Sequence, residues 1–130
     1  MAYREFKADR QRINEKILAE GTTQTKRFFS LDARAYHDGA LSAKTKELLG
    51  LVASTVLRCN DCITYHLDQC IELGCTDEEL HEALDVALVV GGSITIPHVR
   101  HAYRMIEEIR AECKTNGSQS SAHPRPSHGG

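Results

Sequence analysis

The spacing of the apolar residues is the feature that most constrains the fold of this chain. Apolar side chains recur at intervals of three and four, as at Leu48, Leu49, Val52 and Val56, and no segment alternates apolar and polar residues for long. This period is that of one face of an α-helix, whereas strands need a period of two. The sequence therefore predicts an all-α fold of about six helices, over residues 3–20, 23–37, 43–57, 61–73, 77–90 and, after Ser93 as a cap, 94–113.

Residues that begin and end helices divide this pattern. Ser42 is a good N-cap, and Thr76 with Glu79 forms the spacing of a capping box. Gly21 and Gly74 stand where helices are expected to stop.

Length and composition limit the class of protein. The chain has 130 residues, a net charge of -2 and 41% hydrophobic residues, which fits one globular domain. A nucleic-acid-binding protein would usually carry a basic excess. The longest apolar stretch, residues 48–57, is shorter than the roughly 20 residues that span a bilayer. We therefore expect neither nucleic acid nor membrane as a partner.

The first and last segments differ from the body. The first residues are charged and contain no apolar signal core, which favours a reducing, cytoplasmic location. We expect one domain over residues 1–113. Residues 114–130 are rich in Ser, Gly, Pro and His, so we expect a disordered tail there.

The motif most informative about function is Cys59-x-x-Cys62-x-x-x-His66. At the start of a helix, Cys62 and His66 lie on one face and Cys59 lies one turn earlier. The amino terminus of a helix stabilises a thiolate, and the imidazole can accept a thiol proton. A second thiol can then resolve an oxidised sulfur as a disulfide. The motif therefore favours dithiol–disulfide chemistry.

Two other interpretations of the motif remain. Buried cysteines and a hydrogen-bonded histidine would need no chemistry. Zinc could bind Cys59, Cys62 and His66, but Cys70 lies about 16 Å along a straight helix from Cys59. A tetrahedral zinc site would thus need a ligand from elsewhere in the chain.

Glu47 is a further candidate, provided that two helices pack as an antiparallel hairpin. It stands about 13 Å from the end of its predicted helix, and His66 about 9 Å from the start of the next. In such a hairpin the carboxylate comes opposite the imidazole and can orient it. The alternative is a solvated surface glutamate.

These residues, from Glu47 through Cys59 and Cys62 to His66, resemble the signature of the AhpD-like branch of the carboxymuconolactone decarboxylase family. The later segments 74–80 and Gly91-Gly92 are also similar, and the resemblance covers about residues 28–110.

The resemblance implies an all-helical fold with the cysteines in a helical hairpin, and homo-oligomers, commonly trimers or hexamers. It implies a thiol-dependent peroxidase or disulfide reductase with a redox-active Cys59–Cys62 disulfide and no other cofactor. Glu47 and His66 would form the proton relay. A lipoyl-bearing or thioredoxin-like protein would supply electrons, and a peroxiredoxin would be a further partner.

One residue departs from the family pattern. Asp61 stands where studied relatives carry a histidine, and its carboxylate opposes thiolate formation unless the helix terminus offsets it. Because Cys62 has the better access to His66, we expect Cys62 to attack peroxide and Cys59 to resolve.

The remaining cysteines and histidines are given no catalytic role. Cys70, Cys75 and Cys113 are expected to be small hydrophobes or idle thiols. His98 and His101 are expected on a wet or subunit-facing surface. The apolar segment 86–97 is expected to be core or a subunit interface.

Two other functions remain open. One is decarboxylation of a small lactone acid, the chemistry of the parent family, which needs no thiol pair. The other is a redox or zinc-binding adaptor without turnover.

Overall fold

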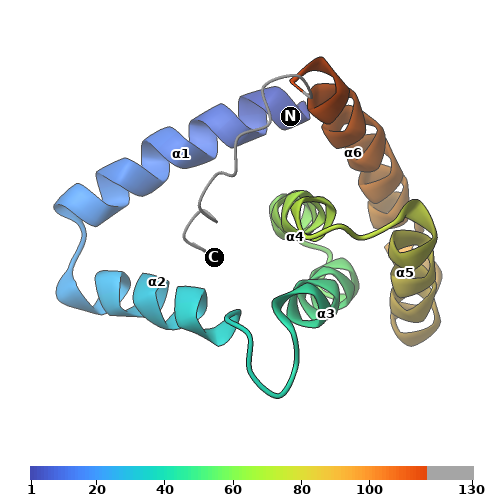
Figure 1. Cartoon of the computed structure of the whole chain (residues 1–130), viewed down its shortest axis with the longest axis horizontal. Coiled ribbons are helices and arrows are strands. Elements are labelled where there is room, and N and C mark those ends of the chain that lie inside the picture. The colour runs from blue at the N-terminus through green and yellow to red at the C-terminus, as the bar shows by residue number, and fades with distance from the viewer. Residues whose placement is uncertain (117–130) are drawn as a thin grey trace.

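The computed structural model describes residues 1–116, which fold into helices joined by short loops (Figure 1). In chain order these are α1 (Tyr3–Glu20), α2 (Thr23–Ala35), α3 (Ala43–Val56), α4 (Asn60–Glu72), α5 (Asp77–Gly91), the 3-10 turn η1 (Ser93–Thr95) and α6 (Ile96–Thr115). Within residues 1–116 there is no strand. The predicted all-α fold of about six helices is confirmed.

Side-chain caps account for several of the helix starts. The hydroxyl of Ser42 accepts the backbone N–H of Thr45 at 3.1 Å. The hydroxyl of Thr76 accepts the N–H of Glu79 at 3.2 Å, and the Glu79 carboxylate accepts the N–H of Thr76 at 2.9 Å. This reciprocal pair is the predicted capping box, and it begins α5. Ser93 was predicted to cap the last helix, but Ser93–Thr95 form η1, so α6 begins two residues later than predicted.

Helix α4 lies at the centre of the packing. It contacts α3 along one side and α6 along another, while α5 packs on α3 (Figure 1). Eight of its thirteen residues are buried, more than in any other described helix. The fold thus surrounds the helix that carries Cys62 and His66.

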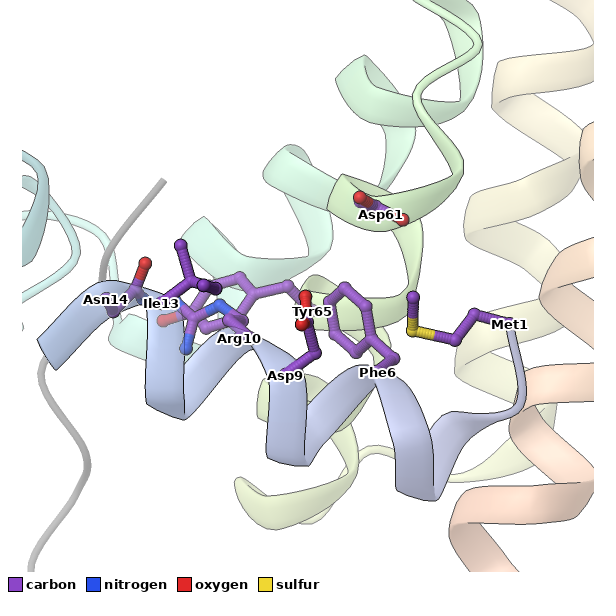
Figure 2. A pocket seen from close by; sticks show the side chains of 8 residues that line it. All are labelled: Met1, Phe6, Asp9, Arg10, Ile13, Asn14, Asp61 and Tyr65. Carbon is purple, nitrogen blue, oxygen red and sulfur yellow. The ribbon is translucent and has the colours of Figure 1, made fainter. Parts of the chain in front are cut away.

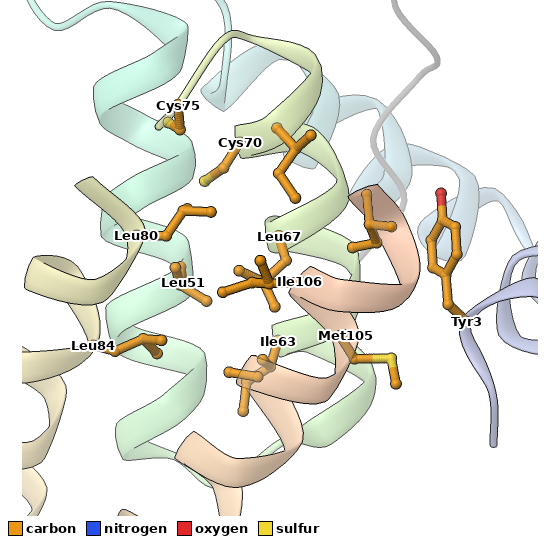
Figure 3. Packing of buried hydrophobic residues seen from close by; sticks show 13 residues of the cluster. Tyr3, Leu51, Ile63, Leu67, Cys70, Cys75, Leu80, Leu84, Met105 and Ile106 are labelled. Carbon is orange, nitrogen blue, oxygen red and sulfur yellow. The ribbon is translucent and has the colours of Figure 1, made fainter. Parts of the chain in front are cut away.

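The core forms where α3, α4, α5 and α6 meet (Figure 3). Leu51, Ile63, Leu67 and Leu80 have no exposed surface, and Ile109 is almost fully buried. Full burial of one such side chain contributes about 1.5–3 kcal/mol. Cys70 and Cys75 belong to the same cluster.

Helices α1 and α2 form an arm that extends away from the other helices and turns back toward α3 (Figure 1). Tyr3 anchors the arm: its ring is 4% exposed and its hydroxyl donates to Asp68 Oδ1 at 2.8 Å. The backbone N–H of Tyr3 donates to Glu108 Oε1 at 2.9 Å. The side chain of Tyr3 thereby joins α1 to α4, and its backbone N–H joins α1 to α6.

The buried cluster includes residues from Tyr3 to Ile109, and α6 continues to Thr115, two residues beyond the expected domain boundary at residue 113. Most of the predicted tail, residues 117–130, lies outside the described residues. No described helix combines the length and apolar character needed to cross a membrane.

Candidate active site

The turn between α3 and α4 positions Cys59. Arg58 adopts a left-handed conformation with φ 61°, and Cys59 N–H donates to Ser54 O at 3.0 Å. Arg58 N–H donates to Thr55 O at 3.1 Å. These two bonds form a Schellman motif, which commonly ends in glycine. The motif turns the chain sharply, so that α4 begins at the residue after Cys59.

Cys59 is itself the N-cap of α4. Its Sγ accepts the backbone N–H of Cys62 at 3.4 Å. A sulfur in this position lies at the positive end of the helix dipole, where negative charge is stabilised. Both cysteines are half-buried free thiols in the same helical turn. The structure therefore places the two sulfurs as a pair that one S–S bond could join.

The environment of Cys62 keeps its proton in place. Burial, a hydrogen bond to Cys59 and the charges of Cys59 and Asp61 together raise the pKa of Cys62 to about 12. The raised pKa works against the predicted role of Cys62 as the attacking thiolate, and attack by Cys62 would need a base to remove the proton during the reaction.

The candidate base, His66, is held by Glu47. His66 Nδ1 lies 2.8 Å from Glu47 Oε1. Glu47 has no exposed surface and His66 is 8% exposed. A carboxylate can only accept, so the ring donates from Nδ1 and presents Nε2 for proton exchange. The contact is compatible with the predicted antiparallel hairpin of α3 and α4.

Gly50 makes room for the imidazole and was not identified from the sequence. A Cβ built at Gly50 would lie 2.6 Å from His66 Cε1, 2.8 Å from Nδ1 and 2.9 Å from Nε2. The ring therefore crosses α3 directly over the one position of that face that lacks a side chain. A glycine inside a predicted helix, three residues after a candidate acid, was the available signal.

Two tyrosines flank the imidazole. The ring of Tyr36, at the end of α2, is tilted against His66 with centroids 5.5 Å apart. Tyr65 makes an edge contact at 5.3 Å. Burial and the charges of Glu47, Asp32 and Cys62 raise the pKa of Tyr36, so its phenol stays protonated. Sequence reasoning missed Tyr36 because only the tertiary fold brings α2 to this point.

Two histidines of α6 bind the first turn of α4. His98 Nδ1 lies 2.7 Å from Asn60 Oδ1. His101 Nε2 lies 2.8 Å from Thr64 Oγ1 and 3.2 Å from the carbonyl oxygen of Asn60. Burial lowers the pKa of His101, in spite of the bond to Asn60 that favours its charged form. Both histidines thus hold the first turn of α4, which carries Cys62. From the sequence they were expected only to lie on a wet or subunit-facing surface.

A pocket opens between α1 and the start of α4 (Figure 2). Asp61 borders it, and the Arg10 guanidinium lies 4.1 Å from the ring centre of Tyr65 on another wall. The lining residues are Met1, Phe6, Asp9, Arg10, Ile13, Asn14, Asp61 and Tyr65. Apolar and charged side chains thus both line the pocket, which Asp61 borders next to Cys62.

The other cysteines divide into two kinds. Cys113 is exposed, whereas Cys70 and Cys75 are buried together at the far end of α4. Within residues 1–116, no three His, Cys, Asp or Glu side chains gather in a way that could hold a metal ion. The zinc ligands considered from the sequence are therefore not assembled by the described residues.

Comparison with known proteins agrees with this geometry. The profile of the carboxymuconolactone decarboxylase family matches residues 25–107. TM1620 of Thermotoga maritima is 58% identical, with a TM-score of 0.81 over 87% of this chain and 95% of that one. Its structure has been described as that of a family member for which a role in the antioxidative response is suggested.

More distant relatives show the same likeness. Lpg0406 of Legionella pneumophila, of the same family, is 30% identical with a TM-score of 0.72, over 84% of this chain and 95% of that one. An uncharacterized protein of the cox locus of Paracoccus denitrificans is 30% identical over 63% of this chain and 74% of its own length. The chain belongs to the carboxymuconolactone decarboxylase family, as its sequence signature predicted.

Proposed function

We propose that this protein is a thiol-dependent peroxidase or disulfide reductase that works through Cys59 and Cys62. The observation that carries the proposal is a dithiol at a helix amino terminus, one turn from an imidazole bound to a buried carboxylate. Structural cysteines need no such base. The suggested antioxidative role of the Thermotoga relative agrees with it.

In the proposed reaction His66 takes the proton of Cys62, and the sulfur attacks the terminal oxygen of an organic hydroperoxide. The O–O bond breaks, a sulfenic acid forms, and the alcohol leaves with the proton from His66. Cys59 then attacks the sulfenic sulfur, the disulfide forms, and water leaves. A dithiol protein of the lipoyl-bearing or thioredoxin-like kind then reduces the Cys59–Cys62 disulfide with two electrons. The regenerated dithiol reacts with another hydroperoxide or passes the electrons on to a peroxiredoxin. Such a cycle suits the reducing cytoplasm.

The test is a map of thiols before and after one equivalent of a small organic hydroperoxide. Cleavage ahead of Asp61 separates Cys59 from Cys62, so a disulfide between them joins two fragments. We expect that pair to be lost and Cys113 to stay free. Five unreacted thiols would contradict the proposal.

The single variants Cys59→Ser and Cys62→Ser decide which sulfur attacks. If Cys62 attacks, the Cys59→Ser protein still forms a sulfenic acid, at a rate that depends on His66. Reaction only in the Cys62→Ser protein would give the attack to Cys59, in keeping with the raised pKa of Cys62.

Decarboxylation of a small lactone acid is the second candidate, because the matching family takes its name from that reaction. The pair Glu47 and His66 could move protons without any thiol. Activity on such a lactone that survives the double change Cys59→Ser and Cys62→Ser would favour it. Loss of all activity in that variant would favour the dithiol reaction.

A further inference from the structure

A second pair of cysteines lies at the opposite end of α4. Cys70 is in the last turn of the helix and Cys75 follows the turn that ends it (Figure 3). Both belong to the buried cluster, with exposed fractions of 0% and 2%. Neither takes part in the proposed reaction of Cys59 and Cys62.

Backbone geometry brings these two residues together. Cys75 N–H donates to Cys70 O at 3.0 Å, and Gly74 N–H donates to Ile71 O at 3.0 Å. Gly74 has φ 89°, so the helix ends in a Schellman motif. A contact between the side chains at the two outer positions, here Cys70 and Cys75, frequently accompanies this motif, and both residues belong to the same buried cluster. The two thiols interact, so that the pKa of Cys70 is raised and that of Cys75 is lowered.

Charges around the pair favour ionisation of one sulfur. The hydrogen bond from Cys70, aided by Lys44 and Arg110, lowers the pKa of Cys75. Arg110 also donates to the carbonyl oxygen of Cys75 at 2.9 Å. Conversely, the same hydrogen bond and burial raise the pKa of Cys70. One sulfur is thus prepared to act as nucleophile and the other carries the proton, as a reactive dithiol requires.

We propose that Cys70 and Cys75 form a second redox site, which organic hydroperoxides convert to an intramolecular disulfide across the end of α4. Cys75 gives its proton to water and attacks the terminal peroxide oxygen. The O–O bond breaks, a sulfenic acid forms, and the departing alkoxide takes a proton from water and leaves as an alcohol. Cys70 then displaces water and the S–S bond closes. Each event transfers two electrons from the thiols to one hydroperoxide molecule.

Burial places this site after the first one in order of reaction. Oxidant reaches Cys75 only when the turn at Gly74 opens locally, whereas Cys59 and Cys62 are half-buried in the native fold. The second pair should therefore react in excess hydroperoxide, after the first pair is spent. Complete oxidation then consumes two equivalents per chain instead of one.

The decisive protein is the triple variant Cys59→Ser, Cys62→Ser and Cys113→Ser, which keeps only Cys70 and Cys75. Treatment with excess tert-butyl hydroperoxide should remove two hydrogens from the intact mass. Cleavage after Glu72 separates the two cysteines, so the disulfide should hold two fragments together. The matched control adds Cys70→Ala, which leaves Cys75 as a sulfenic or sulfinic acid without a disulfide.

The full wild-type chain gives the same test without relying on variants. Titration with hydroperoxide should give the Cys59–Cys62 disulfide first and the Cys70–Cys75 disulfide second. Free Cys70 and Cys75 after full oxidation of the rest, or disulfides between chains, would overturn the inference. The outcome is independent of the proposed function, because the triple variant lacks the first pair.

Discussion

At the scale of single residues, the site depends on a glycine, Gly50, whose lack of a side chain leaves room for the His66 ring. Gly50 lies under the His66 ring, and no larger residue fits there without moving the imidazole. Alanine normally stabilises a helix interior by about 1 kcal/mol relative to glycine. Helix propensity and site geometry therefore oppose each other at this position.

We predict that Gly50→Ala lowers the rate of thiol oxidation by roughly tenfold or more, because it displaces the base that serves Cys62. Peroxide-dependent disulfide formation measures the rate, and circular dichroism shows whether the helices remain. Gly39→Ala is the control, since its Cβ would meet only the end of Lys46 at 3.7 Å. An unchanged rate in the Gly50→Ala variant would show that His66 does not act as the base in thiol oxidation.

The contact between Glu47 and His66 gives a second prediction. Glu47→Gln keeps a hydrogen-bonding side chain of the same size but removes the charge that stabilises an imidazolium. We expect the oxidation rate to fall by about 100-fold while the helical content stays the same. The pH dependence of the rate should change as well, which a purely structural role of Glu47 would not explain.

At the scale of secondary-structure elements, α4 begins and ends at related turns. Both turns are Schellman motifs, with Arg58 in the left-handed position of the first and Gly74 in that of the second. A side chain at positive φ costs about 1–2 kcal/mol, whereas glycine adopts it freely. The turn at Arg58, beside Cys59 and Cys62, is thus strained, whereas the turn at Gly74, beside Cys70 and Cys75, is relaxed.

We predict that Arg58→Gly raises the free energy of unfolding by up to about 1 kcal/mol. Gly74→Ala should lower it by a similar amount, although a Cβ there would meet nothing within 4 Å. Denaturant unfolding of the two variants measures both changes. A loss of stability in Arg58→Gly would show that the arginine side chain contributes more than its backbone strain costs.

The link between α6 and α4 predicts a pH effect on stability. The pKa of His101 is lowered in the folded protein, so folding favours the neutral ring. Its contribution is complete above the unfolded pKa of about 6.5 and is lost as pH falls through the folded value. We expect the stability difference between wild type and His101→Gln to shrink from pH 7.5 to pH 5. An unchanged difference would contradict the prediction.

Local signals in the sequence predicted much of the helical framework. Ser42 and Thr76 cap where predicted because a cap depends on residues only three positions apart. Helix spacing likewise placed Cys62 and His66 one turn apart, and both lie in α4. Contacts between helices far apart in the sequence leave no local signal. The ring contact between Tyr36 and His66 and the hydrogen bond between His98 and Asn60 are therefore seen only in the folded structure. The pairing of Cys70 with Cys75 did have a signal, since Gly74 between them marks a Schellman motif.

At the scale of the whole molecule, a large apolar surface remains exposed along α3 and α5. Leu49, Leu57, Val86, Val89 and Val90 are between 53% and 84% exposed. Most of them line a groove between the two helices, which has almost no polar lining. Apolar patches of this kind mark interaction surfaces, so we propose that copies of the chain associate here, as the expected trimer or hexamer requires.

We predict that Val86→Asp weakens self-association, because a charge within an apolar interface cannot be solvated. Light scattering at several protein concentrations measures the mass. Leu18→Asp on α1, where the native side chain is 45% exposed, is the control. A monomeric wild-type protein, or equal dissociation in both variants, would show that this surface is not the interface.

The position of the tyrosines has a practical consequence for observing the reaction. The chain has four tyrosines and no tryptophan, and Tyr36 and Tyr65 both contact His66. Half of the intrinsic fluorophores therefore lie against the imidazole whose charge is expected to change during turnover. Unlabelled protein thus carries its own optical reporter, and rapid-mixing fluorescence can follow the proton transfer without any added dye.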